Sequence, residues 1–141
     1  METLEEVNRE GSERLYPSVT NPSWLVLRER RRLFQKWMSA LGSGQLSVLD
    51  VGGRIQPYRV LLDGRLRKYV GIDLWQSPLV DVVARAEQIP LASGQFDLVI
   101  CTQVLEYIAE PAAAIAEMHR VLKFGGYLLL SVPAVFPRDS R

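Results

Sequence analysis

The chain has 141 residues, about the size of one average domain and too short for two ordinary ones. Its contents of 48% hydrophobic and 23% charged residues are close to those of globular proteins, and they exclude a disordered, collagen-like or coiled-coil chain. The formal net charge of +1 gives no overall field that would attract nucleic acid or an anionic membrane. Any such partner would need a local patch.

The cysteine content, the acidic N-terminal residues and the length of the apolar runs indicate in which compartment the protein works. The single cysteine, Cys101, excludes a disulfide within the chain, and with only one histidine, His119, a structural zinc cluster is not expected. Residues 1–6 are acidic and no apolar stretch follows them, unlike a secretory signal. The longest apolar run, 127–136, is far shorter than the roughly 20 residues that span a bilayer. We therefore expect a soluble, cytoplasmic protein with no membrane partner and no metal.

Residues 1–20 are polar and lack a sustained apolar period, which predicts an N-terminal arm with little structure of its own. Helix signals begin after it, because apolar residues recur at helical spacing from Trp24 to Leu41 and a Gly-Ser-Gly stop follows. Four arginines lie between positions 28 and 32. We interpret these arginines as a solvated face of the helix, since no nucleic-acid motif accompanies them. We expect residues 21–141 to form a single domain.

From residue 46 onward, short β-branched runs alternate with helical segments, which is typical of βαβ units and a parallel sheet. The expected strands cover residues 47–51, 69–73, 81–84, 96–101 and 127–132. A short helix is expected at 58–62, and a longer one from Pro111 to a stop at Gly125. Right-handed crossovers then predict an α/β fold with one open, doubly wound parallel sheet of order 3-2-1-4-5 and helices on both faces.

Three chemically notable side chains have structural interpretations. Asp97 opens the fourth expected strand, and Cys101 is a small side chain at the end of that buried strand. His119 is near the end of a helix, where cations are favoured. We expect none of the three to act as a catalytic group.

In an open parallel sheet, ligands lie beyond the carboxyl ends of the strands, where the strand order reverses. The first strand ends at Asp50, and Gly52 and Gly53 after it allow a tight turn and a close backbone approach to a ligand. The second strand ends at Asp73, whose carboxylate can accept hydrogen bonds from two ribose hydroxyls. These features predict a nucleoside-type ligand. A nicotinamide dinucleotide is the weaker alternative, because Gly-x-Gly-x-x-Gly is not satisfied from Gly52 onward.

Six motifs follow one another in a specific order and spacing, at residues 48–53, 69–73, 86–90, 96–100, 104–107 and 120–126. With them, residues 48 to 133 resemble class I S-adenosylmethionine-dependent methyltransferases, specifically the small-molecule branch often called type 11. The resemblance implies a Rossmann-like fold, S-adenosylmethionine as the cofactor, and methyl transfer to a small-molecule acceptor.

The resemblance also assigns the turn and the ribose site. Asp50, Gly52 and Gly53 would approach the methionine part of the cofactor. Asp73 would hold the ribose hydroxyls, and Leu74 would pack on the adenine.

Two further pairs complete the site that the resemblance implies. Ala86 and Glu87 would border the edge of the adenine. Thr102 and Gln103 would lie near the methionine amino group and the methyl to be transferred. No side chain stands out as a general base, so the sequence identifies no catalytic residue.

Some departures from the family pattern bear on the cofactor site and on the extent of the sheet. Arg54 and Gln56 occupy later glycine positions of the turn, so a side chain projects where a close backbone approach is expected. Arg85 stands where the family commonly has an aspartate that accepts from the adenine amino group, and a guanidinium can only donate. The family's sheet continues past strand five with further helix and two more strands, whereas this chain extends only nine residues beyond Val132. We therefore expect a sheet that lacks those C-terminal strands.

The strand at 127–132 has no charge or proline to discourage pairing, which predicts a homodimer or a higher aggregate through this edge. An alternative to catalysis also stays open. A truncated or degenerate relative could keep the scaffold, bind the cofactor poorly, and act by binding or self-association.

Overall fold

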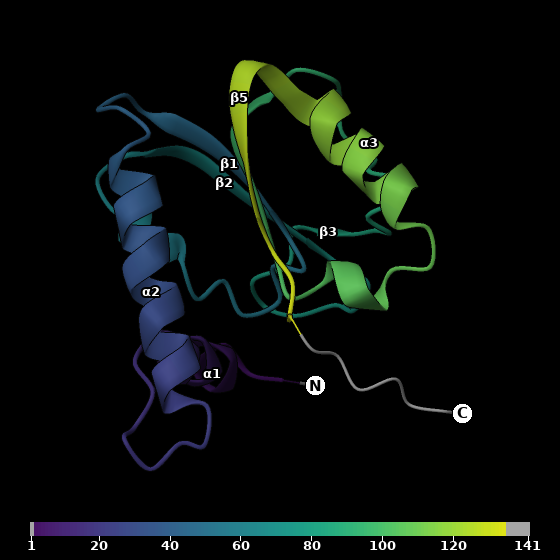
Figure 1. Ribbon diagram of the computed structural model, residues 1–141. Helices are drawn as coiled ribbons and strands as arrows, with labels where there is room; N and C mark the ends of the chain where they lie inside the picture. Colours follow the sequence, from purple (N-terminus) through teal and green to yellow (C-terminus); the bar gives the residue numbers. More distant parts are fainter. Residues whose placement is uncertain (1, 135–141) are drawn as a thin grey trace.

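The computed structural model describes residues 2–134 and contains one five-stranded sheet of order β3-β2-β1-β4-β5 (Figure 1). All four pairs of neighbouring strands are parallel. The strands are β1 (Leu46–Val51), β2 (Leu66–Asp73), β3 (Val82–Val83), β4 (Phe96–Thr102) and β5 (Leu122–Ser131). The predicted order, direction and fold class are confirmed.

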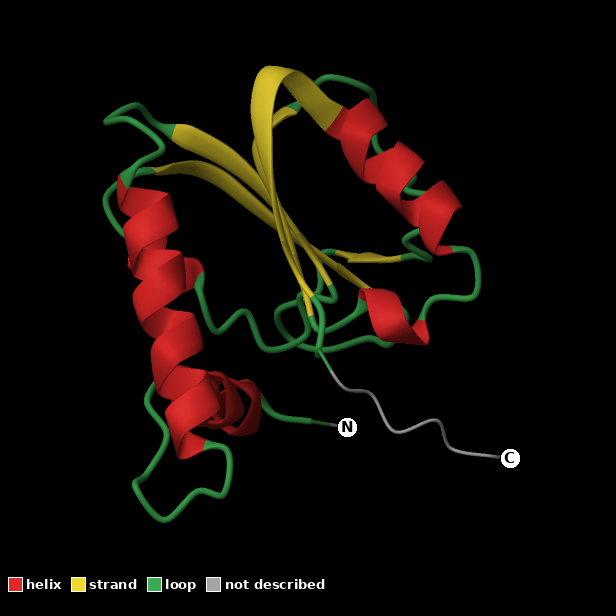
Figure 2. Ribbon diagram, viewed as in Figure 1, coloured by secondary structure: helices red, strands yellow, loops and turns green. Residues whose placement is uncertain are grey.

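Helices cover both faces of the sheet, as Figure 2 shows. The first two helices, α1 (Leu4–Leu15) and α2 (Trp24–Ser39), lie on one side, and α3 (Pro111–Val121) lies on the other. Two short 3₁₀ helices, η1 (Arg59–Leu62) and η2 (Leu105–Tyr107), follow β1 and β4. None of the helices between residues 2 and 134 is long and apolar enough to cross a membrane.

The sheet separates two apolar cores. Alternate residues of β1 point to opposite faces, so Val48 packs with Phe34 of α2, while Leu49 packs with Met118 of α3. All four of these side chains are buried. Burial on both faces explains the nearly continuous apolar runs that identified the strands.

The prediction that residues 1–20 have little structure is wrong, because residues 4–15 form helix α1. A capping box begins the helix: Thr3 Oγ1 accepts from the Glu6 N–H at 3.2 Å, and Thr3 N–H donates to Glu6 Oε2 at 2.7 Å. Val7 and Leu15 are buried on the inner side of the helix. This apolar stripe is sparse and interrupted by charged residues, which is why the periodicity missed it.

The boundary between α3 and β5 also differs from the prediction. The helix ends at Val121 and the strand begins at Leu122, so Gly125 lies within the strand and does not end the helix. Leu122 pairs with Phe96, the first residue of β4, and this pairing fixes the early start of the strand. Ile115, in the middle of α3, is 39% exposed and lies outside the buried face of the helix.

The structural interpretation of Asp97 fits its contacts. Asp97 Oδ2 accepts from the Ser47 N–H of β1, and Oδ1 accepts from Lys123 Nζ of β5, both at 2.8 Å. Burial opposes ionisation of this carboxyl, but the hydrogen bonds from Lys123 and Ser47 outweigh it and lower the pKa of Asp97. This side chain therefore joins three strands.

Cys101 and His119 also lie where a structural interpretation places them. Cys101 is buried in the core, and burial raises the pKa of its thiol to about 12. His119 is exposed in the last turn of α3.

Candidate functional site

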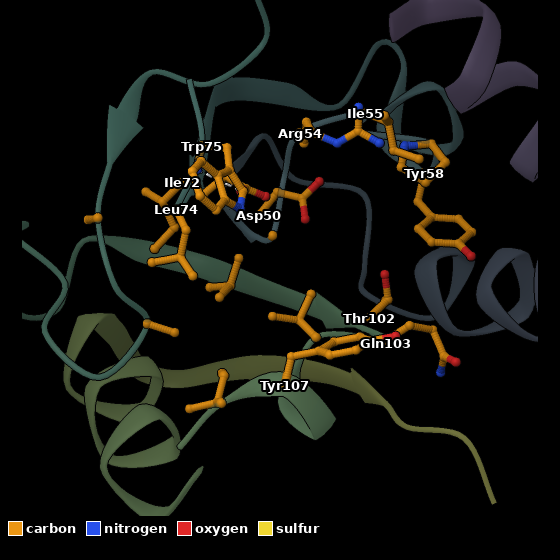
Figure 3. A pocket seen from close by; sticks show the side chains of 18 of the residues that line it. Asp50, Arg54, Ile55, Tyr58, Ile72, Leu74, Trp75, Thr102, Gln103 and Tyr107 are labelled. Carbon is orange, nitrogen blue, oxygen red and sulfur yellow. Dashed lines mark hydrogen bonds between the residues drawn. The ribbon is translucent and has the colours of Figure 1, made fainter. Parts of the chain in front are cut away.

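A cavity of about 350 Å³ lies at the carboxyl ends of the strands (Figure 3). Its walls come from the turn after β1, the end of β2, the loop after β3 and the end of β4, with further residues from α1 and α2. Eight of the nine residues predicted for the site line it: Asp50, Gly52, Asp73, Leu74, Ala86, Glu87, Thr102 and Gln103. The ninth, Gly53, does not line the cavity.

Two glycines shape the turn after β1 in different ways. Gly52 has φ of 78°, and a Cβ there would lie 2.3 Å from the Val104 side chain, so only glycine fits. Gly53 packs behind the turn, where a Cβ would lie 3.1 Å from Gly71 Cα. The N–H groups of both glycines already donate to the Ile72 carbonyl, at 2.9 and 3.0 Å. The turn therefore brings its backbone close to the cavity without offering these two donors.

Asp50 is the buried acid of the site, with only 4% of its surface exposed. Its Oδ2 accepts a 2.6 Å hydrogen bond from the Tyr69 hydroxyl of β2. Burial raises the pKa of Asp50 to about 7, although the Tyr69 hydrogen bond opposes the rise. A cationic ligand nearby would favour the ionised carboxylate, so this acid can respond to the charge of a bound molecule.

Asp73 ends β2 and keeps one carboxylate oxygen available. Its Oδ1 accepts from the Trp75 N–H at 3.0 Å, whereas Oδ2 has no hydrogen-bond partner in the part of the chain that the structure describes. Leu74 and Trp75 follow directly, and their side chains lie together at one end of the cavity (Figure 3). Trp75 is 74% exposed and was missed from the sequence. The arrangement joins a hydrogen-bond acceptor to an apolar surface suited to a planar ring.

Arg85, which stands where the family has an aspartate, is neutralised locally. Its Nη2 lies 2.8 Å from Glu87 Oε1. Hydrogen bonds from the backbone N–H of Glu87 itself and from Arg85 lower the pKa of Glu87. The guanidinium therefore has a partner within the site, beside the buried Ala86.

Thr102 ends β4, and Gln103 follows it, at the other end of the cavity. Gln103 has φ of 57°, in the left-handed region that is unusual for a residue with a side chain. Its N–H donates to the Ser131 carbonyl at 2.8 Å, and its side-chain amide lies 3.3 Å from Ser131 Oγ. These two bonds to β5 hold an unfavourable backbone conformation in place, as often occurs at binding sites.

Arg54 and Gln56, which occupy glycine positions of the family's turn, are also accommodated. The Arg54 guanidinium pairs with two acids of the N-terminal segment. Its Nη1 lies 2.6 Å from Glu2 Oε1, and its Nη2 lies 2.7 Å from Glu10 Oε1. Gln56, with φ of 41°, is buried and donates from Nε2 to the Leu79 carbonyl at 2.6 Å. These two side chains anchor the turn to its surroundings.

Three charged residues from the two N-terminal helices complete the lining: Glu10 and Arg14 of α1, and Arg30 of α2. No local pattern in the sequence marks these three residues, because they meet the strand ends only in the folded chain. Arg30 belongs to the arginine stretch that was expected to be a solvated face. That expectation is wrong for Arg30, which is half-buried against the cavity.

Comparison with known proteins finds methyltransferases among the relatives of this chain. A family model described as a methyltransferase domain matches residues 49–130. The ubiquinone biosynthesis O-methyltransferase of Pseudomonas aeruginosa strain LESB58 is 46% identical over an alignment that covers 60% of this chain and 43% of that protein. The chain thus spans less than half the length of the curated relatives that it matches first.

Solved structures share the fold. A SAM-dependent methyltransferase from Aquifex aeolicus superposes with a TM-score of 0.62 at 19% identity, covering 97% of this chain and 79% of that one. The cyclase SpnF superposes with a TM-score of 0.60 at 25% identity, covering 81% of this chain and 48% of that one. The fold therefore also occurs in a protein that is named for a different reaction.

Proposed function

Because the chain belongs to the class I S-adenosylmethionine-dependent methyltransferases, we propose that it binds S-adenosylmethionine in this cavity and transfers the methyl group to a small-molecule acceptor. The observation that carries the proposal is the convergence of Asp50, Asp73 and Thr102, from three adjacent parallel strands, on one cavity. The relatives named as O-methyltransferases support the reaction type.

The residues present fit the cofactor. The Oδ2 atom of Asp73 can accept from ribose hydroxyls, while Leu74 and Trp75 provide an apolar surface for adenine. The carboxyl of Asp50 lies deeper in the site and would be stabilised in its ionised form by the positive charges of the methionine part. When bound, S-adenosylmethionine supplies a methyl group already activated by its positively charged sulfur.

The residues of the chain therefore need to align and enclose the reactants more than to exchange protons. Gln103 is fixed by two contacts with Ser131, which gives the end of β4 a rigid surface near the position assigned to the methyl group. Rigid positioning of two reactants contributes strongly to rate. We assign no general base to this site.

Transfer can be tested with S-adenosylmethionine that carries a radiolabelled methyl group. The protein is incubated with this cofactor and a small-molecule extract, and the products are separated by size. We expect label in small molecules with the wild-type protein and a large loss with Asp73→Ala. Label that enters only macromolecules, or no transfer by a protein that binds the cofactor, would contradict the proposal.

We also propose that β5 pairs with β5 of a second copy. Among residues 2–134, β5 pairs only with β4, so its outer edge presents unpaired backbone groups. Tyr127, in the middle of the strand, is 57% exposed, and no proline interrupts the edge. A second copy offers a strand of the same length and apolar character.

Light scattering at increasing protein concentration tests the dimer. We expect Tyr127→Lys, which places a charge on this edge, to shift the protein toward the monomer. Val19→Lys, in the exposed loop between α1 and α2, serves as the control for an added charge. A wild-type protein that stays monomeric at high concentration would contradict the proposal.

The single cysteine supports a reducing compartment, and we propose that the protein works in the cytoplasm.

A further inference from the structure

Two of the four arginines that line the cavity lack an acidic partner. Arg54 is neutralised by Glu2 and Glu10, and Arg85 is neutralised by Glu87. No carboxylate of residues 2–134 lies within 4.0 Å of Arg14 or Arg30, which also line the cavity. The cavity wall therefore carries two guanidinium groups that form no ion pair with an acid among residues 2–134.

Arg14 and Arg30 line the cavity together with Tyr58, whose ring is buried against Phe34. Burial raises the pKa of Tyr58, while a hydrogen bond with Arg30 and the charges of Arg30 and Arg14 oppose the rise. Three elements thus converge here, since Arg14 comes from α1, Arg30 from α2, and Tyr58 from the segment before η1.

The position of Tyr58 identifies the end of the cavity that is positively charged. Figure 3 shows the Tyr58 hydroxyl on the same side as Thr102 and Gln103, and on the opposite side from Leu74 and Trp75. The two ends therefore differ chemically. One offers apolar side chains and the Asp73 carboxylate, and the other offers two guanidinium groups and a phenol.

We propose that Arg14, Arg30 and Tyr58 form an anion subsite that holds the acidic group, a carboxylate or a phosphate, of the methyl acceptor. The proposal rests on the proposed function, which places the methyl group near Thr102 and Gln103 and therefore beside this subsite. Guanidinium groups bind carboxylate and phosphate through paired N–H donors, and the phenol adds one further donor.

The charges of this subsite also favour an acid over a neutral ligand. Two cations that line the same cavity repel each other, and the repulsion is stronger where solvent is excluded. An acidic group between Arg14 and Arg30 would relieve the repulsion, so the subsite favours an anionic acceptor over a neutral one of the same shape.

A pair of probes with the same shape and different charge tests the subsite: benzoate and benzamide. Each is titrated by calorimetry or NMR into the protein saturated with S-adenosylhomocysteine. We expect wild-type protein to prefer benzoate by roughly tenfold, and Arg14→Gln and Arg30→Gln each to remove most of this preference. Arg32→Gln is the matched control, because Arg32 is on the same helix, 66% exposed and paired with Glu29. Equal binding of both probes by the wild-type protein would overturn the proposal.

A second pair of ligands tests whether the arginines serve the cofactor instead. S-adenosylhomocysteine carries a carboxylate, whereas 5′-methylthioadenosine has no amino-acid part. We expect Arg30→Gln to bind both as the wild-type protein does. A selective loss of S-adenosylhomocysteine would assign the arginines to the carboxylate of the cofactor and overturn the acceptor subsite. Failure of the folded wild-type protein to bind S-adenosylhomocysteine would instead contradict the proposed function itself.

Discussion

Arg54 Nη2 lies 2.7 Å from Glu10 Oε1, and this ion pair joins helix α1 to the turn that follows β1. The turn forms one wall of the cavity, so an N-terminal helix that the sequence did not predict takes part in the site. Next to Glu10, Gly11 packs so tightly that a Cβ would lie 2.5 Å from the Ile55 carbonyl oxygen of the same turn.

This packing predicts that Gly11→Ala destabilises the protein. Glycine within a helix ordinarily costs roughly 0.5–1 kcal/mol relative to alanine, so the same change elsewhere would stabilise. Here the added methyl meets backbone that cannot move away easily, and we expect a loss of about 1–3 kcal/mol in the free energy of unfolding. Urea denaturation measures the change. Ser12→Ala, at the next and exposed position of α1, is the control. A stabilised Gly11→Ala variant would show that α1 does not pack on the turn.

The sequence predicted the sheet well because each strand of the parallel sheet has its own local signal, a short apolar run. The same logic located Asp50 and Asp73, since the ends of parallel strands gather at one edge of the sheet. The family resemblance supplied Leu74, Ala86, Glu87, Thr102 and Gln103, which line the same cavity.

The parts that were missed depend on contacts between distant segments. The inner face of α1 is stabilised by the turn at Arg54 and Ile55, far along the chain. The local signals for this helix were the Thr3–Glu6 capping box and a sparse apolar stripe. Whether Arg30 faces solvent or the cavity depends on how α2 lies on the sheet, and helical periodicity does not specify this. The start of β5 at Leu122 depends on pairing with Phe96 of β4.

Asp73→Ala is expected to weaken binding of S-adenosylhomocysteine. The loss of hydrogen bonds to a charged acceptor should cost on the order of 1.5–3 kcal/mol, which is roughly a ten- to hundredfold loss of affinity. Isothermal titration gives both dissociation constants. Asp63→Ala, which removes an exposed acid outside the cavity lining, controls for the change of charge. A variant at position 73 that titrates like the parent would remove Asp73 from the cofactor site.

Asp50 predicts a specific dependence of stability on pH. Its pKa in the folded protein is raised to about 7 by burial, compared with an ordinary value of 3.8. The folded state therefore holds this proton more tightly, and the stability contributed by Asp50 is lost as the pH rises from about 3.8 through about 7. The variant Asp50→Asn keeps the shape of the side chain and an oxygen that can accept from the Tyr69 hydroxyl, but it does not ionise. We therefore expect wild-type protein to lose more stability between pH 5 and pH 8 than Asp50→Asn does. If both proteins lost the same free energy of unfolding between pH 5 and pH 8, the buried, protonated carboxyl would be contradicted.

Cys101 predicts resistance to alkylation. Its side chain is buried, and burial raises the pKa of the thiol to about 12, so almost no reactive thiolate exists at neutral pH. We expect iodoacetamide to label the native protein very slowly and the guanidinium-unfolded protein readily, as followed by mass spectrometry. Equally fast labelling in both states would show that β4 is open to solvent at this position.

Isothermal titration of the folded wild-type protein with S-adenosylhomocysteine addresses cofactor binding most directly. We predict one molecule bound per chain, with a dissociation constant on the order of micromolar. No detectable binding by protein whose circular dichroism shows the folded domain would contradict the cofactor site, and would favour a methyltransferase fold that acts through association without catalysis.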